Sequence, residues 1–368
     1  MEASARFYKI LVISDYRSVI SSRPEAEVFV SLARLGHDVT ILSYPDAPYY
    51  NERFRTMGIE VIEKHPTHKF SRSYVKYLRA LVRQRGFDFV HAFNSRGLVN
   101  ANWALRGLNT KLIAYRGYAG QTHWYDPMMY LKYFHPRVDH IICLSDDIRM
   151  ILQRNMLFGK NKLTTIHKGH DPEWYKDVIP ADRQAMGLKP DDVLYCFVAN
   201  VRPFKGLPYL LEATYQLDLS LPIHFLMIGN GYDEPAISKQ IDQSPFSSRI
   251  HRLGYRLDAL SIVAMSDGLI LPSTHGEALT KSVIEAMCLG IAPIITDIPG
   301  NKGVVIDGKS GWVVPARDAS ALALAITDSA THPEERRRRG ENAKRHIAEH
   351  FNTDNTVQEF LNLYSKLK

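Results

Sequence analysis

The sequence predicts an α/β protein of two domains, each built around a parallel, doubly wound sheet. Short apolar runs alternate with helical patterns along the first half of the chain, which is typical of strands joined by crossover helices. The same alternation starts again after a linker at residues 174–181. With 368 residues and 45% apolar content, the chain is long enough to form two such domains.

Strands are predicted where short apolar runs are bounded by turn residues. In the first half these runs are Lys9–Ser14, Asp38–Ser43, Gly58–Ile62, Phe87–Ala92, Lys111–Tyr115 and His140–Leu144. In the second half they are Val193–Ala199, Ile223–Ile228, Ile250–Leu253, Gly268–Leu271, Ile291–Thr296 and Gly311–Val314. The helices that can be bounded most clearly are Pro24–Leu35, Gly206–Leu217, Tyr255–Met265, Leu279–Leu289 and Ala319–Ser329.

These elements predict an N-terminal domain at residues 1–175 and a C-terminal domain at residues 182–352. A last helix at residues 353–368 is amphipathic, so it could pack back on the first domain or on the second.

The composition excludes several classes of protein. Residues 1–9 are mixed in charge and the apolar run at residues 10–13 is too short for a secretory leader, so we expect none. No stretch approaches the roughly 20 apolar residues of a membrane span. Cys143, Cys196 and Cys288 stand singly in apolar surroundings, which favours buried thiols in the cytoplasm.

Positive charge is concentrated in the first half of the chain. Residues 1–175 hold 25 Lys or Arg against 16 Asp or Glu, whereas the remainder holds 21 against 23. Arg72, Lys76, Arg79 and Arg83 recur at helical spacing and therefore share one helix face. Such a face is most often simply solvated, and the alternative is a surface that meets anionic phospholipid. Nucleic acid is not expected as a partner, because no known binding motif accompanies the charge.

Two acids eight positions apart, Glu277 and Glu285, lie at a predicted strand–loop–helix junction. Ligands of open α/β sheets bind beyond the carboxyl ends of the strands, where the first turn of a helix offers free N–H groups to an anion. Acids flanking that turn would repel phosphate, so they are better suited to accept hydrogen bonds from hydroxyl groups. A ligand with hydroxyl-rich ends and a diphosphate between them satisfies both conditions. A lone pair of Glu at this spacing, however, is more often simply helix-forming.

Arg202 and Lys205 follow the first strand of the second domain, three positions apart. Both can reach a diphosphate there, Arg as a fork and Lys as a point charge. Gly206 after them permits close backbone approach.

Further motifs accompany these residues in order. They are Asn200-Val-Arg-Pro-Phe-Lys-Gly206, Ile228-Gly-Asn-Gly231, His251-Arg-Leu-Gly254, Leu271-Pro-Ser273, Glu277 to Glu285 with Glu-Ala-Met, and Thr296-Asp-Ile-Pro-Gly300. This series resembles that of retaining glycosyltransferases of family 4, strongly over residues 190–330. The first domain is similar more loosely, through Arg34 to Val39, Leu144 to Asp146 and Gly169 to Asp171.

The resemblance implies the GT-B fold, in which two Rossmann-like domains face each other across a cleft. It implies that Arg202, Lys205 and Glu277 are catalytic, and that Glu285 accepts hydrogen bonds from ribose. It assigns the rest of the donor site to Gly206, Gly229, Arg252, Leu253, Gly254, Ala278, Leu279, Thr280 and Lys281, with Ser282 and Asn301 as weaker candidates.

The first domain departs from the family pattern in two places. Many relatives carry a Gly-Gly loop after the first strand, whereas residues 16–24 contain no glycine, so Ser21, Ser22 or Arg23 would take its place. Many also carry a cleft His after the strand that matches Lys111–Tyr115. Here Arg116 follows that strand, with His123 seven positions further on, and both are carried over as acceptor-side candidates.

No Asp-X-Asp pair lies at a strand end, so we expect transfer that needs neither a metal ion nor a cofactor. The resemblance implies that the anomeric configuration is retained. The expected donor is a nucleotide sugar, with UDP favoured and GDP or ADP open. The expected acceptor is a lipid-linked or phosphorylated envelope glycan, such as lipopolysaccharide core, at an anionic cytosolic membrane face. A nucleotide-sugar epimerase of the same fold and a non-catalytic nucleotide-sugar-binding protein remain alternatives.

Overall fold

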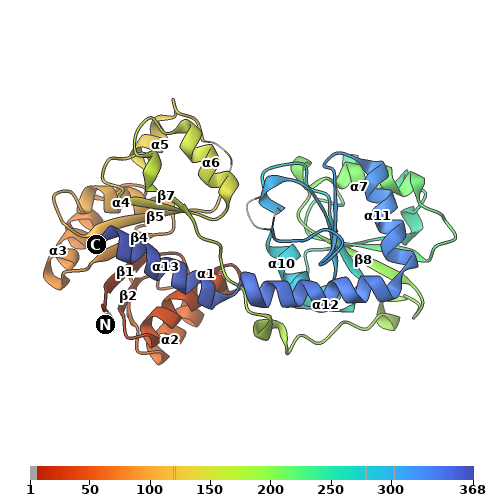
Figure 1. The fold of residues 1–368 in the computed structure, drawn as a ribbon, viewed down its shortest axis with the longest axis horizontal. Helices are drawn as coiled ribbons and strands as arrows, with labels where there is room; N and C mark the ends of the chain where they lie inside the picture. Colours follow the sequence, from red (N-terminus) through yellow and green to blue (C-terminus); the bar gives the residue numbers. More distant parts are fainter. Residues whose placement is uncertain (1–5, 119, 121, 278–279, 302) are drawn as a thin grey trace. The chain divides into compact units, whose positions relative to one another are not determined.

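The chain forms two units, each around its own parallel sheet (Figure 1). One unit comprises Met1–Gly169 together with Thr353–Lys368, and the other comprises His170–Asn352. In this computed structural model the described residues are 6–118, 120, 122–277, 280–301 and 303–368. Within them, no helix is both long enough and apolar enough to cross a bilayer.

The first sheet has the strand order β3-β2-β1-β4-β5-β6-β7, with every neighbouring pair parallel. Strands β4 and β6 are wholly buried and β1 is buried after Lys9, which explains why they read as continuous apolar runs. The strands are β1 (Lys9–Ile13), β2 (Asp38–Leu42), β3 (Glu60–Ile62), β4 (Phe89–Ala92), β5 (Lys111–Arg116), β6 (His140–Cys143) and β7 (Leu163–Thr165).

Seven α-helices surround this sheet in the described part of the unit. Most begin at a polar side chain that accepts a hydrogen bond from the first turn, such as Ser71, Asn94 and Ser145. The helices are α1 (Val19–Arg34), α2 (Pro48–Thr56), α3 (Arg72–Arg85), α4 (Ser95–Ala104), α5 (Pro127–Leu131), α6 (Asp146–Asn155) and α13 (Thr353–Leu367).

Helix α1 begins five residues before the predicted start at Pro24, so that prediction is wrong. Ser18 caps the helix by accepting from the Ser21 N–H, and Pro24 lies inside the helix, where it removes one internal donor. Ser21, Ser22 and Arg23 therefore belong to a helix and not to a loop.

Helix α13 packs against α1 although it comes last in the chain. The ring of Phe360 meets Phe29 of α1 edge-on at 6.0 Å, and that of Tyr364 stacks on Phe89 of β4 at 4.3 Å. The Tyr364 hydroxyl also lies 2.8 Å from Nε2 of the buried His91. This helix completes the core of the first unit.

The second sheet has the strand order β10-β9-β8-β11-β12-β13, again parallel throughout. Counted from the first strand of the unit, this is the order 3-2-1-4-5-6 of a Rossmann sheet, and the order reverses between β8 and β11. The strands are β8 (Val193–Val198), β9 (Ile223–Ile228), β10 (Ile250–Gly254), β11 (Gly268–Leu271), β12 (Pro293–Thr296) and β13 (Trp312–Val314). The helices are α7 (Leu207–Ala213), α8 (Pro235–Asp242), α9 (Ala259–Met265), α10 (Lys281–Cys288), α11 (Ala319–Thr331) and α12 (Pro333–His350).

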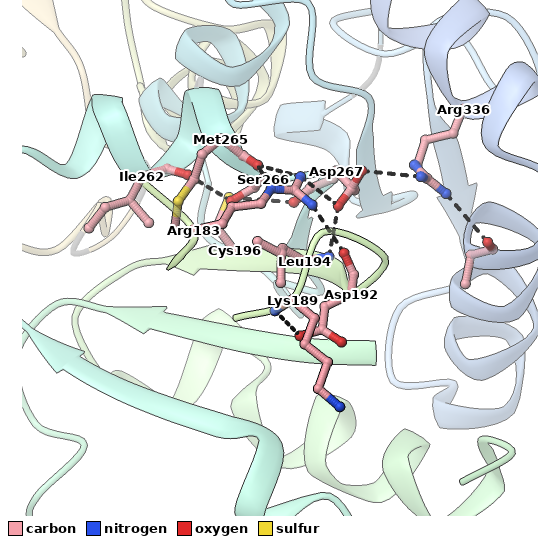
Figure 2. A network of polar contacts seen from close by, with 12 residues as sticks. Arg183, Lys189, Asp192, Leu194, Cys196, Ile262, Met265, Ser266, Asp267 and Arg336 are labelled. Atoms are coloured by element: carbon pink, nitrogen blue, oxygen red, sulfur yellow. Dashed lines mark hydrogen bonds and ion pairs between the residues drawn. The ribbon is translucent and has the colours of Figure 1, made fainter. Parts of the chain in front are cut away.

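A polar network closes the amino end of this sheet (Figure 2). Asp267, just before β11, accepts hydrogen bonds from Arg183 at 3.0 Å, from the Leu194 N–H at 2.9 Å and from Arg336 of α12 at 3.2 Å. Arg183 also donates to the Met265 carbonyl at 2.6 Å. The network joins the incoming chain, two strands and α12, and it leaves the opposite, carboxyl edge of the sheet for other groups.

Candidate functional site

The loops that follow β8 and β11 leave the carboxyl edge of the second sheet as neighbours, because these two strands are adjacent in the sheet. The order of the strands reverses between them, and this is the position where open α/β sheets bind their ligands. Lys205 lies on the first loop, in a short 3-10 helix at Pro203–Lys205, and Glu277 lies on the second.

The structure brings Lys205 and Glu277 into direct contact. Lys205 Nζ donates to Glu277 Oε1 at 2.6 Å, and the Ser273 hydroxyl donates to the same oxygen at 2.7 Å. The two loops are also joined by their backbones, since the Thr274 N–H donates to the Phe204 carbonyl at 2.8 Å. The Glu277 side chain is only 9% exposed, so its orientation is held by these partners.

Gly206 permits this close approach of the loops. It has φ +80°, and a Cβ atom placed on it would lie 1.8 Å from the Pro272 carbonyl oxygen. Because no side chain fits that distance, the position requires glycine on steric grounds as well as for its backbone angle.

Gly229 plays a similar part at the end of β9. Its φ is +142°, and a Cβ atom there would lie 2.2 Å from the Ala199 carbonyl oxygen. Its N–H donates to the Gly254 carbonyl at 2.8 Å, which joins the ends of β9 and β10. The backbone thus offers a surface without side chains beside the Lys205 loop.

Arg252 turns its side chain toward α8. Its guanidinium donates to the Ser238 hydroxyl at 2.7 Å and forms an ion pair with Asp242. Leu253 is half-buried and packs on the core of the unit. These two residues can therefore meet a ligand at this edge chiefly through their main chain.

Glu285 lies on the second turn of α10 and is buried, with a side chain that is 11% exposed. Its Oε1 pairs with Lys281 Nζ at 2.9 Å, one helical turn earlier. Burial raises the pKa of the Glu285 carboxyl above its ordinary value, and the Lys281 ammonium opposes that rise.

Thr280 stands at the N-cap of α10, and its side chain makes no capping hydrogen bond to the helix. Its hydroxyl instead donates to Asn301 Oδ1 at 3.4 Å, and Asn301 donates to the Thr296 carbonyl at 2.9 Å. Among the described residues, the N–H groups of Lys281 and Ser282 have no acceptor, whereas the Val283 N–H donates to the Thr280 carbonyl at 3.1 Å. Ala278 and Leu279, also predicted here, lie outside the described residues, and Ser282 is half-buried within α10.

Arg202 differs from the two lysines of this site because it is exposed. Lys205 and Lys281 each neutralise one of the two acids. Among the residues that the structure describes, the Arg202 guanidinium has no hydrogen-bond or ion-pair partner. Arg202 therefore leaves one uncompensated positive charge on the loop that follows β8.

The acceptor-side candidates belong to the first unit. Ser22 is buried in α1, and its hydroxyl donates to the Asp15 carbonyl at 3.1 Å, while Arg23 is half-buried one position later. Arg116 ends β5 and donates to the Gly120 carbonyl at 2.7 Å and to the Thr122 hydroxyl at 3.1 Å.

His123 is exposed, and its ring stacks on Tyr125 at 5.1 Å. Arg116 is thus bound within its own loop, whereas His123 is open to solvent.

Sequence reasoning did not assign two contacts at the second-unit site. Ser273 shares the oxygen of Glu277 that Lys205 binds, and the Lys281 side chain pairs with Glu285, although only its backbone had been considered. The i,i+4 spacing of Lys281 and Glu285 was the available signal for the second contact. In the described part of the chain, no group of three or more His, Cys, Asp or Glu side chains is arranged to hold a metal ion.

Both units of the chain are similar to known protein families. The family model "Glycosyl transferases group 1" matches residues 178–346, and the model "Glycosyltransferase Family 4" matches residues 27–174. An uncharacterised glycosyltransferase of Methanocaldococcus jannaschii is 26% identical over 64% of this chain and 60% of that protein, so the match spans less than two thirds of this relative. The Escherichia coli UDP-Gal:alpha-D-GlcNAc-diphosphoundecaprenol alpha-1,3-galactosyltransferase is 23% identical over 78% of this chain and 77% of that protein.

Solved structures resemble the fold over nearly its whole length. A glycosyltransferase from Rickettsia africae has a TM-score of 0.80 at 17% identity and covers 98% of this chain and 99% of its own. The Anabaena protein HepE in complex with UDP has a TM-score of 0.76 at 16% identity and covers 97% of this chain and 100% of its own. At these identities the likeness concerns the fold alone, and that fold is GT-B.

Proposed function

Because the chain belongs to the glycosyltransferases of group 1 and family 4, and hence is an enzyme with the GT-B fold, we propose that its second unit binds a nucleoside diphosphate sugar between Glu277 and Glu285. The observation that carries the proposal is the contact of Lys205 with Glu277 at the point where the strand order reverses. A nucleotide-sugar donor is also supported by the relative named for UDP-Gal and by the related fold solved with UDP.

Each part of the donor has a chemical counterpart in this proposal. Glu285 accepts hydrogen bonds from the ribose hydroxyls, and Glu277 accepts them from the transferred sugar. Arg202, Lys205 and the open N–H groups of α10 face the diphosphate. They stabilise the charge that develops on the leaving group, a role in which loss of one donor costs about 10²–10³ in rate. In this proposal no metal ion is needed to stabilise the charge on the leaving diphosphate. The acceptor hydroxyl attacks the sugar on the face from which the diphosphate leaves. The anomeric configuration is then retained, and no protein nucleophile is needed.

UDP is the favoured nucleotide. GDP and ADP are also candidates, because the Arg252 side chain is bound to α8 and the base would therefore meet mainly backbone, which does not select one base. The proposed acceptor is a hydroxyl of a lipid-linked or phosphorylated envelope glycan at the anionic cytosolic face of a membrane. The excess of cations in residues 1–175 supports this assignment, as does the lipid-linked acceptor in the name of the Escherichia coli relative.

Thermal unfolding with UDP, GDP and ADP tests the donor assignment. A ligand that binds only the folded state raises the melting temperature by mass action. We expect one of the three to do so, and we expect the effect to vanish in Lys205→Ala and Glu277→Gln. Lys239→Ala, which removes an exposed lysine of α8 in the same unit, is the matched control and should keep the shift. No shift with any of the three nucleotides would sink the proposal.

Activity with the nucleotide sugar then tests the reaction. The product should appear only with an acceptor and with its anomeric configuration retained. Interconversion of the donor without an acceptor would instead indicate an epimerase.

A further inference from the structure

Two buried asparagines of α4 in the first unit hold two neighbouring segments in place, at residues 69–71 and at residues 131–132. Asn100, fully buried, accepts from the Ser71 N–H at 2.9 Å and donates to the Lys69 carbonyl at 3.2 Å. Asn102, also fully buried, donates to the Leu131 carbonyl at 3.1 Å and to that of the next residue at 3.0 Å. Buried amide groups that donate to backbone carbonyls fix the position of that backbone, so this surface is preformed.

Three large apolar side chains are exposed on this preformed surface. Phe70 is 46% exposed, Trp103 is 37% exposed and Leu131 is 42% exposed. The rings of Phe70 and Trp103 meet edge-on at 5.8 Å, so they form one continuous apolar ridge. Grouped apolar exposure of this kind marks an interaction site more often than scattered residues do.

Cations surround the ridge. The Arg106 guanidinium lies over the Trp103 ring at 4.4 Å. Burial and the charges of Lys69 and Arg116 lower the pKa of the Lys132 ammonium, which places Lys132 among like charges, and only Asp126 opposes them. Residues 64–137 contain 13 Lys or Arg and two acids, Asp88 and Asp126. Two of these cations pair with acids outside that range, Arg85 with Glu60 and Arg137 with Asp139, and the region as a whole remains positive.

We propose that this aromatic–basic face, formed by Lys69, Phe70, Trp103, Arg106, Leu131 and Lys132, docks on the surface of a membrane that contains anionic phospholipid. Charge alone would suit any polyanion, but a polyanion gains nothing from Phe70 and Leu131. Trp, Phe and Leu enter the headgroup region of a bilayer, and neighbouring Lys and Arg meet the lipid phosphates. The inference rests on the proposed membrane-linked acceptor and names the surface that would serve it.

The basic stripe of α3 that the sequence suggested is less suited to this task. Arg79 donates to the Ala104 and Arg106 carbonyls at 2.7 Å each, so it is used inside the fold. Arg72, Lys76 and Arg83 are exposed. No large apolar side chain of α3 is exposed beside them in the described residues.

Co-flotation with vesicles tests the face. We expect the full chain to float with vesicles of about 30% phosphatidylglycerol and much less with neutral vesicles. Lys69→Glu with Lys132→Glu should lower the partition coefficient at least twentyfold, since each neutralised cation accounts for about fivefold. Phe70→Ala with Trp103→Ala should also lower it, and that loss should persist at higher salt, where electrostatic attraction is screened.

Two control pairs test whether binding depends on this face, on the net charge of the unit or on the exposed residues Leu157 and Phe158. Arg154→Glu with Lys160→Glu reverses the same charge on exposed positions of the same unit, and it should lower binding several-fold less. An equal loss in that pair would overturn the proposal. So would loss of binding with Leu157→Ser and Phe158→Ser, whose side chains are 56% and 85% exposed, while the face variants still bind.

Two further readouts separate this proposal from the donor assignment. Each variant should keep the nucleotide-induced rise in melting temperature, because none of these residues belongs to the second unit. Failure of the unmodified chain to float, or binding to heparin with no binding to vesicles, would reject the membrane surface and leave the donor site standing.

Discussion

Each of the two acids of the proposed donor site is paired with a lysine in this structure. Lys205 holds Glu277 at 2.6 Å, and Lys281 holds Glu285 at 2.9 Å. A buried carboxylate is costly unless it is paired, so each lysine compensates the charge of its acid before a ligand arrives. If the proposed sugar donor binds here, its hydroxyls must share these acids with the lysines or displace the lysines from them.

The pH dependence of nucleotide binding should report the state of Glu285. Its pKa is raised by burial, so as pH falls this carboxyl protonates before an exposed glutamate does, and it then accepts fewer hydrogen bonds from ribose. Binding is therefore expected to be intact at neutral pH and to weaken as pH falls toward the raised value. Lys281→Met removes the opposing charge and should move the loss to higher pH.

Calorimetric titration with the nucleotide that raises the melting temperature measures this profile. Lys281→Arg should restore the native curve, and Glu285→Gln should remove the dependence on this group. Lys239→Met is the exposed control. Identical profiles for the native chain and Lys281→Met would contradict the assignment.

At the scale of elements, the site depends on how closely two loops approach each other. The Thr274 N–H bonds to the Phe204 carbonyl, and Gly206 leaves no room for a side chain beside Pro272. A change of one atom at Gly206 should therefore affect both the stability of the unit and the contact between Lys205 and Glu277.

Gly206→Ala is expected to lower both stability and nucleotide binding. The left-handed backbone alone costs an alanine about 1–2 kcal/mol, and the 1.8 Å approach to the Pro272 oxygen adds a forced shift of the loop. Gly187→Ala isolates the first effect, because Gly187 has φ +73° with no atom within 4 Å of the added Cβ.

Melting curves with and without nucleotide distinguish the two effects. Gly187→Ala should lose only a few degrees of melting temperature, as expected for about 1–2 kcal/mol, and should keep the nucleotide response. If the two variants behaved alike, close approach at Gly206 would not matter.

Most strands of both sheets could be predicted from the sequence, because buried parallel strands are continuous apolar runs bounded by turns. Strand β7 was missed because Leu163–Thr165 is short and only half-buried at the sheet edge. The start of α1 was placed too late because Pro24 was taken as a first-turn residue, whereas the Ser18 cap carries the helix past it.

The charged residues of the proposed donor site were predicted instead from motifs that keep their order along the chain, and the structure brings Lys205 to Glu277 and Lys281 to Glu285. The direction of each side chain could not be predicted from the sequence. Arg252 points to α8 and Ser273 points to Glu277 because of packing between segments far apart in the sequence, which no local pattern encodes.

At the scale of the whole molecule, buried histidines are concentrated in the first unit. Burial lowers the pKa of His65 and of His140 to about 4 and that of His91 to about 3. The folded unit therefore excludes protons that the unfolded chain takes up below about pH 6.5. Stability falls as pH falls through that range, by about 1.4 kcal/mol per pH unit for each neutral histidine.

The first unit should accordingly lose stability markedly between about pH 6.5 and about pH 4. Urea unfolding followed by tryptophan fluorescence in a Trp174→Phe, Trp312→Phe background reports this unit, because Trp103 and Trp124 remain. His91→Gln should make the pH dependence less steep, and His123→Gln, at an exposed position, should not. An unchanged slope in His91→Gln would show that its protonation does not limit acid stability.

The return of α13 to the first unit also determines the order in which the protein can be made. A ribosome delivers residues 6–169 early, but the helix that covers Phe29 and Phe89 emerges only after the entire second unit. During synthesis part of the core of the first unit therefore stays exposed to solvent until α13 is made. The second unit can fold as soon as its own residues have left the ribosomal tunnel. We therefore expect chaperones to bind the first unit while residues 170–352 are being synthesised, until α13 completes its core.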